Sequence, residues 1–226
     1  HLQNVRNDAL QNLITALLIA NPAYSGLPVV PEVAVFFHEH LLRGNRARKV
    51  HASGFGAFES PNWPVLGTAG ESIVVHQQNL RSMPAGARLE ARLSLETNVA
   101  AAYLFPGIQS GEVMGHMLAD RNLRGVVLLA YGAGTMPDDE RLLGAIEAAV
   151  RRGVVAVAVT QCGAGRVHLR RYRASARLRQ AGVISGVDIT PEAALVKLMV
   201  LLGDRSLSTG EVREWMQRDL AGEMTP

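Results

Sequence analysis

The stretch Val154-Val155-Ala156-Val157-Ala158-Val159 (VVAVAV) decides the fold class. Six consecutive apolar residues, four of them β-branched, predict a strand that is covered on both faces, which is typical of a parallel sheet. Further strand-like runs occur at 91–95, 99–104 and 126–131. Helical patterns occur at 110–119, 138–151, 172–181, 191–202 and 209–220. Strands that alternate with helices indicate βαβ units, so residues 89–226 are predicted to form a small, complete α/β domain.

Residues 1–76 show a different organisation, which resembles the end of another α/β domain. Residues 8–20 have helical spacing, with Leu10, Leu13, Ile14, Leu17 and Leu18 on one predicted face. Strands are predicted at 33–37 and 72–76, with a hairpin partner at 40–43 and mostly loop over 46–58. The polar residues 77–88 have no periodicity and are interpreted as a linker.

The composition excludes several classes of protein. The chain has 226 residues, 48% apolar residues, a net charge of +3 and one cysteine. These values exclude a disordered chain, a disulfide framework and a Cys-rich zinc site, and no apolar run is long enough for a membrane helix. The seven histidines form no metal-ligand motif, so no metal and no cofactor is expected. The arginines between 166 and 179 are interpreted as a solvated helix face, so no nucleic acid partner is expected.

Two lysines, one cysteine and one glycine-rich turn mark candidate functional positions. Arginine outnumbers lysine 21 to 2, and the two lysines are Lys49 and Lys197. Lysine, unlike arginine, can lose its proton near neutral pH when it is desolvated, so a chain that prefers arginine can retain lysine for proton transfer. Cys162 follows the VVAVAV strand, and the Gly132-Ala133-Gly134 turn follows another strand. Parallel α/β sheets place their ligand sites at these strand ends.

Several segments resemble the cytoplasmic (type I) L-asparaginase family. They are LLRGNRARKV at 41–50, FGAFESPN at 55–62, YGAG at 131–134, VTQC at 159–162 and AGVISGVDITPEAALVKL at 181–198. The segment DLAGEMTP at 219–226 is similar to the animal lysophospholipase/asparaginase type within that family. The resemblance implies the C-terminal part of the family's N-terminal domain at 1–80, a linker at 81–90, and its C-terminal α/β domain, which is flavodoxin- or Rossmann-like, at 91–226.

The resemblance implies hydrolysis of L-asparagine to L-aspartate and ammonia through a threonine nucleophile. Lys49 aligns with the family's catalytic lysine, which serves a second threonine. The two threonine motifs of the family, TGGT and HGTDT, do not occur in residues 1–226. We therefore expect these residues to be part of a longer asparaginase, not a complete translation product, and to be inactive alone.

Other positions depart from the family pattern. Thr135 replaces an asparagine that approaches the active site of a neighbouring subunit in the family, and His51 replaces an aspartate. An effector site for asparagine in some members corresponds to Arg48, Leu129 and Cys162, of which Cys162 alone matches. Arg48 and Cys162 are thus a candidate remnant of that site, and Thr135 is a candidate substrate-binding residue across subunits.

The family also implies partners and a compartment. We expect asparagine as the substrate, a homodimer or homotetramer, a cytoplasmic location, and neither nucleic acid nor membrane as a partner. Two alternatives stay open. The departures at Arg48, His51, Leu129 and Thr135 fit a non-catalytic binding or assembly module derived from an asparaginase. The archaeal tRNA-dependent amidotransferase subunit is a related enzyme that fits the quoted segments less well.

Overall fold

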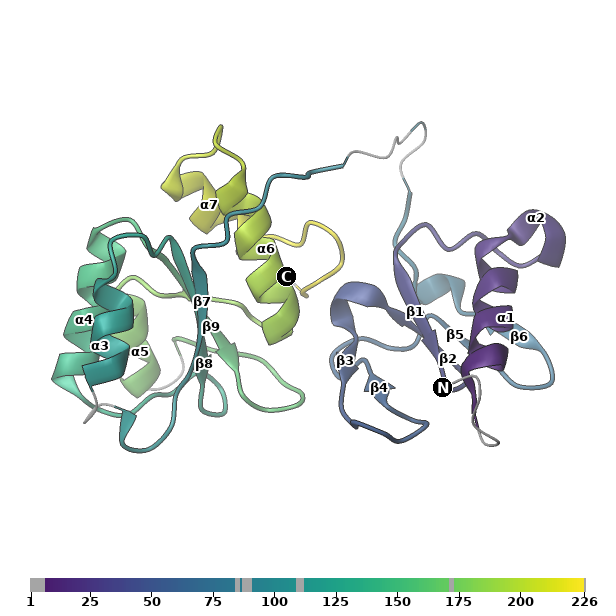
Figure 1. Cartoon of the computed structure of the whole chain (residues 1–226), viewed down its shortest axis with the longest axis horizontal. Coiled ribbons are helices and arrows are strands. Elements are labelled where there is room, and N and C mark those ends of the chain that lie inside the picture. The colour runs from purple at the N-terminus through teal and green to yellow at the C-terminus, as the bar shows by residue number, and fades with distance from the viewer. Residues whose placement is uncertain (1–6, 84–85, 87–90, 109–111, 171–172, 226) are drawn as a thin grey trace. The chain divides into compact units, whose positions relative to one another are not determined.

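The structure is a computed structural model that describes residues 7–83, 86, 91–108, 112–170 and 173–225. The chain divides into two compact units, His1–Leu89 and Glu90–Pro226. The first contains mainly antiparallel strands with two helices, and the second contains a parallel sheet between helices (Figure 1). The predicted α/β class is confirmed.

The second unit is built on four parallel strands in the order β10-β9-β8-β7. The predicted VVAVAV strand is confirmed as β9, in which all six residues are buried. Its neighbour β8 buries most of its residues as well, because helices cover both faces of the sheet. The strands are β7 (Val99–Tyr103), β8 (Gly125–Ala130), β9 (Val155–Thr160) and β10 (Ile184–Ser185).

Alternation along the strands divides the core into two layers. Val126, Leu128 and Ala156 face the layer that contains α3 (Glu112–Ala119), α4 (Glu140–Arg151) and α5 (Arg173–Gln180). Val127, Val155 and Val157 face α6 (Pro191–Gly203) and α7 (Thr209–Trp215). Figure 1 shows α3, α4 and α5 on one side of the sheet and α6 on the other.

The predicted helix starts are confirmed by side-chain caps. Asp139 accepts a hydrogen bond from the backbone N–H of Leu142 (2.8 Å), and Thr190 accepts one from that of Ala193 (3.2 Å). Ser208 forms a capping box with Glu211. These bonds satisfy amide groups that the first turn of a helix leaves without partners.

Two predicted elements of the second unit differ in the structure. Residues 91–98 form no strand, because the segment runs beside the end of α6, where the Glu96 N–H donates to the carbonyl of Met199 (3.0 Å). Helix α7 ends at Trp215, not at 220, and beyond it the N–H groups of residues 220–222 donate to side-chain carboxylates rather than to helix carbonyls. Asp219 accepts from Gly222 (2.6 Å), and Glu223 accepts from Ala221 (2.6 Å).

In the first unit, the predicted hairpin is confirmed. Strand β1 (Ala34–Phe37) pairs with β2 (His40–Arg43) in an antiparallel sheet of order β1-β2-β5-β6. The remaining strands of this sheet are β5 (Gly67–Ala69) and β6 (Ile73–Val75). Residues 46–58 are not only loop: β3 (Arg48–Lys49) pairs with β4 (Phe58–Glu59) across it. The helices are α1 (Ala9–Ala20) and α2 (Pro22–Ser25), with 3-10 turns η1 (Gly44–Arg46) and η2 (Gln77–Asn79).

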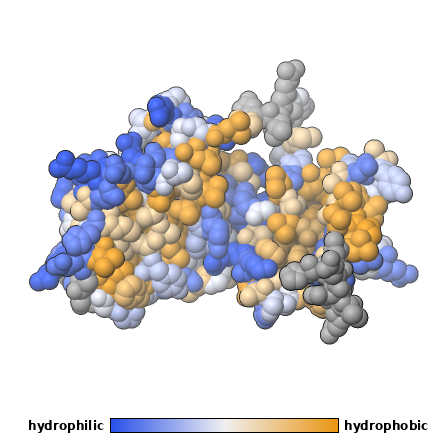
Figure 2. Space-filling model, viewed as in Figure 1, coloured by the Kyte–Doolittle hydropathy of each residue, from blue (hydrophilic) through white to orange (hydrophobic). Residues whose placement is uncertain are grey.

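Helix α1 forms as predicted, but its apolar face is not buried in the chain. Leu10, Leu13 and Leu17 are 53%, 53% and 61% exposed, whereas Ile19 is buried. Figure 2 shows apolar surface over this helix. Helical spacing thus predicted the helix correctly, but which of its residues contact the sheet depends on the position of the hairpin.

A buried ion pair fixes the C-terminal segment. Lys197, on α6, is 8% exposed, and its Nζ lies 2.5 Å from Oε1 of Glu223. The same ammonium donates to the carbonyls of Met216 (3.3 Å) and Arg218 (2.5 Å). Burial raises the pKa of Glu223, but the hydrogen bond and charge of Lys197 outweigh it and hold that pKa below its usual value. Lys197 is therefore a structural residue.

Replacing Lys197 with Met leaves the Glu223 carboxylate buried without a cation. We expect a loss of about 3–5 kcal/mol in the free energy of unfolding, whereas the double variant K197M/E223L loses less. Urea denaturation measures both losses. Equal losses in the single and double variants would contradict the pairing.

Because its folded-state pKa is lowered, Glu223 contributes stability above its unfolded-state pKa of about 4.3, and this contribution is lost as the pH falls through the folded-state value. The variant E223Q is expected to show a flatter dependence of stability on pH below about 4.3. Denaturation of both proteins between pH 3 and 7 measures the difference. Parallel pH profiles would contradict the expectation.

Candidate functional site

Lys49 lies on β3, where it is paired with Phe58 of β4. Its side chain is exposed, and Nζ is 4.8 Å from the centroid of the Phe58 ring. The ring of Phe58 in turn packs against Phe37 of β1, with centroids 5.1 Å apart. A cation–π contact with an anchored ring restricts where the ammonium points while leaving it accessible for proton transfer.

The loop between β3 and β4 is closed by His51. Its Nδ1 accepts hydrogen bonds from the backbone N–H groups of Ser53 (3.1 Å) and Gly54 (2.6 Å). The Val50 N–H donates to the carbonyl of Ala57 (2.8 Å) and continues the pairing of the two strands. A carboxylate at position 51 could accept the same two bonds, so the departure from the family's aspartate preserves a turn acceptor next to Lys49.

A buried polar network supports the segment that leads to Lys49. Arg43 and Glu32 form an ion pair whose side chains are 3% and 6% exposed. Arg43 also donates to the carbonyl of Asn79 (3.1 Å) and lies 4.5 Å from the centroid of Trp63. Arg46 is also buried, and its guanidinium lies 5.4 Å from the centroid of the same indole. The arginines of the LLRGNR segment are thus structural residues that fix the start of β3.

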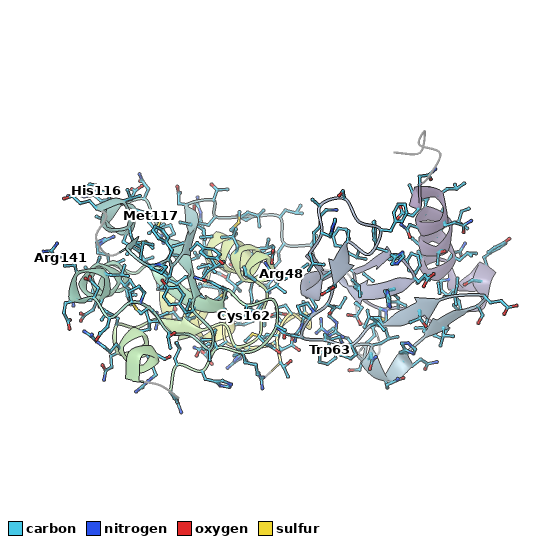
Figure 3. The ribbon with its side chains drawn as sticks, turned by 90° about the horizontal axis from the view of Figure 1, so that it is seen from below. Arg48, Trp63, His116, Met117, Arg141 and Cys162 are labelled. Atoms are coloured by element: carbon cyan, nitrogen blue, oxygen red, sulfur yellow. The ribbon has the colours of Figure 1, made fainter. Side chains whose placement is uncertain are left out.

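A second cluster joins the carboxyl ends of three parallel strands. The Gln161 side-chain amide donates to the carbonyls of Leu104 (2.5 Å) and Leu129 (2.7 Å). Leu104 directly follows β7, and Leu129 belongs to β8. The Thr160 hydroxyl donates to the carbonyl of Gly132 (2.6 Å) and accepts from the N–H of Cys162 (3.0 Å). Cys162 is exposed at this edge of the sheet (Figure 3).

The turn after β8 is closed by Tyr131 and Thr135. Each backbone N–H donates to the carbonyl of the other at 2.9 Å, and the Thr135 hydroxyl lies 3.3 Å from the same Tyr131 carbonyl. Gly134 adopts a φ of +104°, and a Cβ there would lie 2.7 Å from a methyl group of Val167. This turn therefore requires glycine at 134, and it presents a half-buried Thr135 beside the Thr160–Cys162 segment.

The predicted site residues lie at two places in the fold, one in each unit. Arg48 and Lys49 are neighbours on β3, and Thr135 and Cys162 follow adjacent strands of the parallel sheet. Sequence reasoning missed Gln161 and Thr160, although polar residues directly after a buried strand were an available signal. In the part of the chain that the structure describes, no group of three or more potential ligands could hold a metal ion, and no helix is long and apolar enough to cross a membrane.

Family models match both units. Residues 1–81 match the model described as Asparaginase, N-terminal, and residues 98–216 match the Glutaminase/Asparaginase C-terminal domain. The chain belongs to the asparaginase family. The predicted resemblance is confirmed, and the two matches lie in the expected order.

Individual asparaginase-family proteins are similar over almost the whole chain. The human 60 kDa lysophospholipase is 41% identical over 97% of this chain and 37% of its own length. L-asparaginase 1 of Escherichia coli K12 is 37% identical over 100% of this chain and 64% of its own length. The crystal structure of L-asparaginase I from Vibrio cholerae is 40% identical, with a TM-score of 0.88 over 100% of this chain and 65% of that one. The chain thus spans less than two thirds of these relatives.

Replacing Thr160 with Val removes the hydroxyl that joins Gly132 to Cys162. Because one carbonyl and one N–H lose their partner, we expect the free energy of unfolding to fall by about 1–3 kcal/mol. The matched control is Thr97→Val at an exposed position, which is expected to change little. Chemical denaturation compares the two variants, and equal effects would contradict a structural role for the Thr160 hydroxyl.

Proposed function

We propose that these 226 residues serve the hydrolysis of L-asparagine to L-aspartate and ammonia, as part of a longer asparaginase. The observation that carries the proposal is the position of Lys49. By the sequence resemblance Lys49 aligns with the family's catalytic lysine, and the match of both units to asparaginase models supports the proposal. The proposal includes inactivity of residues 1–226 alone, since the threonine motifs of the family do not occur among them.

In this proposal Lys49 transfers a proton for a threonine hydroxyl supplied by the rest of the protein. Attack of that hydroxyl on the side-chain amide carbon forms an acyl-enzyme and releases ammonia, and water then releases aspartate. The accessible position of Lys49 on β3 and its contact with the ring of Phe58 support this role, because a group that transfers a proton must be reachable and held in position.

The same proposal gives roles to the remaining site residues. Thr135 would contact substrate across a subunit boundary in a homodimer or homotetramer, and Arg48 with Cys162 would be a remnant of an effector site. The carboxyl edge of the parallel sheet supports a ligand-binding role for Thr135 and Cys162, because sites in such folds form there. A cytoplasmic location is part of the proposal and follows from the family resemblance.

Hydrolysis by the purified chain tests the inactivity. We expect no ammonia release from asparagine above that of the variant K49A. Circular dichroism confirms that both proteins are folded. Activity of the 226-residue chain that K49A abolishes would overturn this part of the proposal.

The coding sequence upstream of residue 1 tests whether these residues belong to a longer asparaginase. We expect in-frame TGGT and HGTDT motifs, and in that longer protein K49A lowers kcat by about 100-fold or more. The matched variant K49R retains the charge but cannot release a proton near neutral pH, so it is expected to stay inactive. Full activity of K49R would contradict proton transfer by Lys49.

The alternative function is a non-catalytic binding or assembly module, and the residues at Arg48, His51 and Thr135 favour it. It predicts that calorimetry detects asparagine binding without ammonia release in a protein that begins near residue 1. Absence of binding in that protein would exclude asparagine as its ligand.

A further inference from the structure

A cavity of about 660 Å³ in the second unit is lined by basic residues from several elements. Arg170 comes from the loop before α5, Arg179 from α5 and Arg213 from α7. His168 adds a fourth cationic or hydrogen-bonding group, and Val183 and Ile184 form part of an apolar wall. No Asp or Glu is among the described residues that line it.

Arg213 is the most unusual of these residues. Its Nη2 donates to the carbonyl of Gly182 (2.7 Å), whereas its Nη1 is buried and has no hydrogen-bond partner in the described part of the chain. Burial lowers the pKa of Arg213, which means that its charge is partly desolvated. A guanidinium that is partly buried without an acidic partner is costly, and an anion in the adjoining cavity would stabilise its charge.

The acidic residues of α7, and the two that contact α5, bind groups other than these three arginines. On α7, Glu211 caps the helix at Ser208, and Glu214 pairs with Arg218. Arg177, on α5, forms ion pairs with both Asp138 and Glu140. Among the described residues, the arginines at 170, 179 and 213 have no ion pair. The stretch 166–179 was predicted to be a solvated helix face, but Arg170 lies before the helix and lines this cavity with Arg179.

The abundance of arginine does not by itself explain this arrangement. A second cavity of about 410 Å³ is also lined by three arginines, at 121, 124 and 152. There Arg152 donates to the carbonyl of Leu118, and none of the three has a buried nitrogen without a partner. The cavity at Arg213 therefore combines excess positive charge with an unsatisfied donor.

We propose that this cavity binds a small organic molecule that carries a phosphate group. The planar guanidinium of arginine matches phosphate oxygens in a two-pronged geometry, and a phosphate ester carries close to two negative charges at pH 7. The volume lies within the range of small-molecule sites and exceeds the needs of a single phosphate, so the apolar wall accommodates the body of the ligand. Asparagine is a poor match, because its net charge is zero. This site does not depend on the proposed asparagine hydrolysis.

Calorimetric titration with ribose 5-phosphate at constant ionic strength tests the proposal. We expect saturable binding, weakened about tenfold in R179Q and in R213Q, because each variant removes one positive charge from the lining of the cavity. The matched control is R141Q, which removes the same charge from an exposed arginine that projects from α4 (Figure 3). It is expected to bind as tightly as the unaltered chain.

Inorganic phosphate and succinate are the comparison ligands. Tighter binding of ribose 5-phosphate than of either supports an organic phosphate site. Equal binding of succinate, absence of saturation, or equal effects of R141Q and R179Q would overturn it. Because Arg179 is exposed and forms no ion pair in the described chain, R179Q is expected to fold, so the test does not depend on R213Q.

Discussion

The burial of strand β9 on both faces is the constraint on which the second unit depends. Six residues without an exposed side chain require one helical layer on each side of the sheet, and the chain provides α3, α4 and α5 on one side and α6 and α7 on the other. Burial also removes water from the end of the strand, so the backbone groups there need partners from the chain. Gln161 and Thr160 supply them, and the edge that carries Thr135 and Cys162 becomes an ordered surface.

Local patterns predicted the elements whose causes are local. The buried strands, the caps at Asp139, Thr190 and Ser208, and the hairpin at β1 and β2 follow from nearby residues. The predictions failed where contacts with a distant part of the chain determine the local structure. Residues 91–95 form no strand in spite of their apolar alternation, and Lys49 pairs with Phe58 across a loop in which His51 accepts a backbone hydrogen bond. The polar network of Arg43 was not predictable, since Glu32, Trp63 and Asn79 are far apart in the sequence and meet only in the folded unit.

The two lysines show how far a compositional argument reaches. Scarcity of lysine singled out Lys49 and Lys197 alike, yet their surroundings differ completely. Lys197 is buried among three carbonyl or carboxylate oxygens that fix the C-terminal segment, while Lys49 is exposed on a short strand against an aromatic ring. An ammonium can approach several oxygens from one point, which a planar guanidinium cannot, and this explains why arginine does not replace Lys197. Composition thus identifies residues under constraint, and geometry identifies which constraint applies.

The exposed position of Cys162 limits the oxidation chemistry available within these 226 residues. As the only cysteine among them, it has no partner for a disulfide inside residues 1–226, so its sulfur can join only a thiol from elsewhere. Mild oxidation would therefore yield a covalently linked pair of these chains or a mixed disulfide with a small thiol such as glutathione. For the same reason a single maleimide fluorophore would attach at one known place, at the carboxyl edge of the parallel sheet.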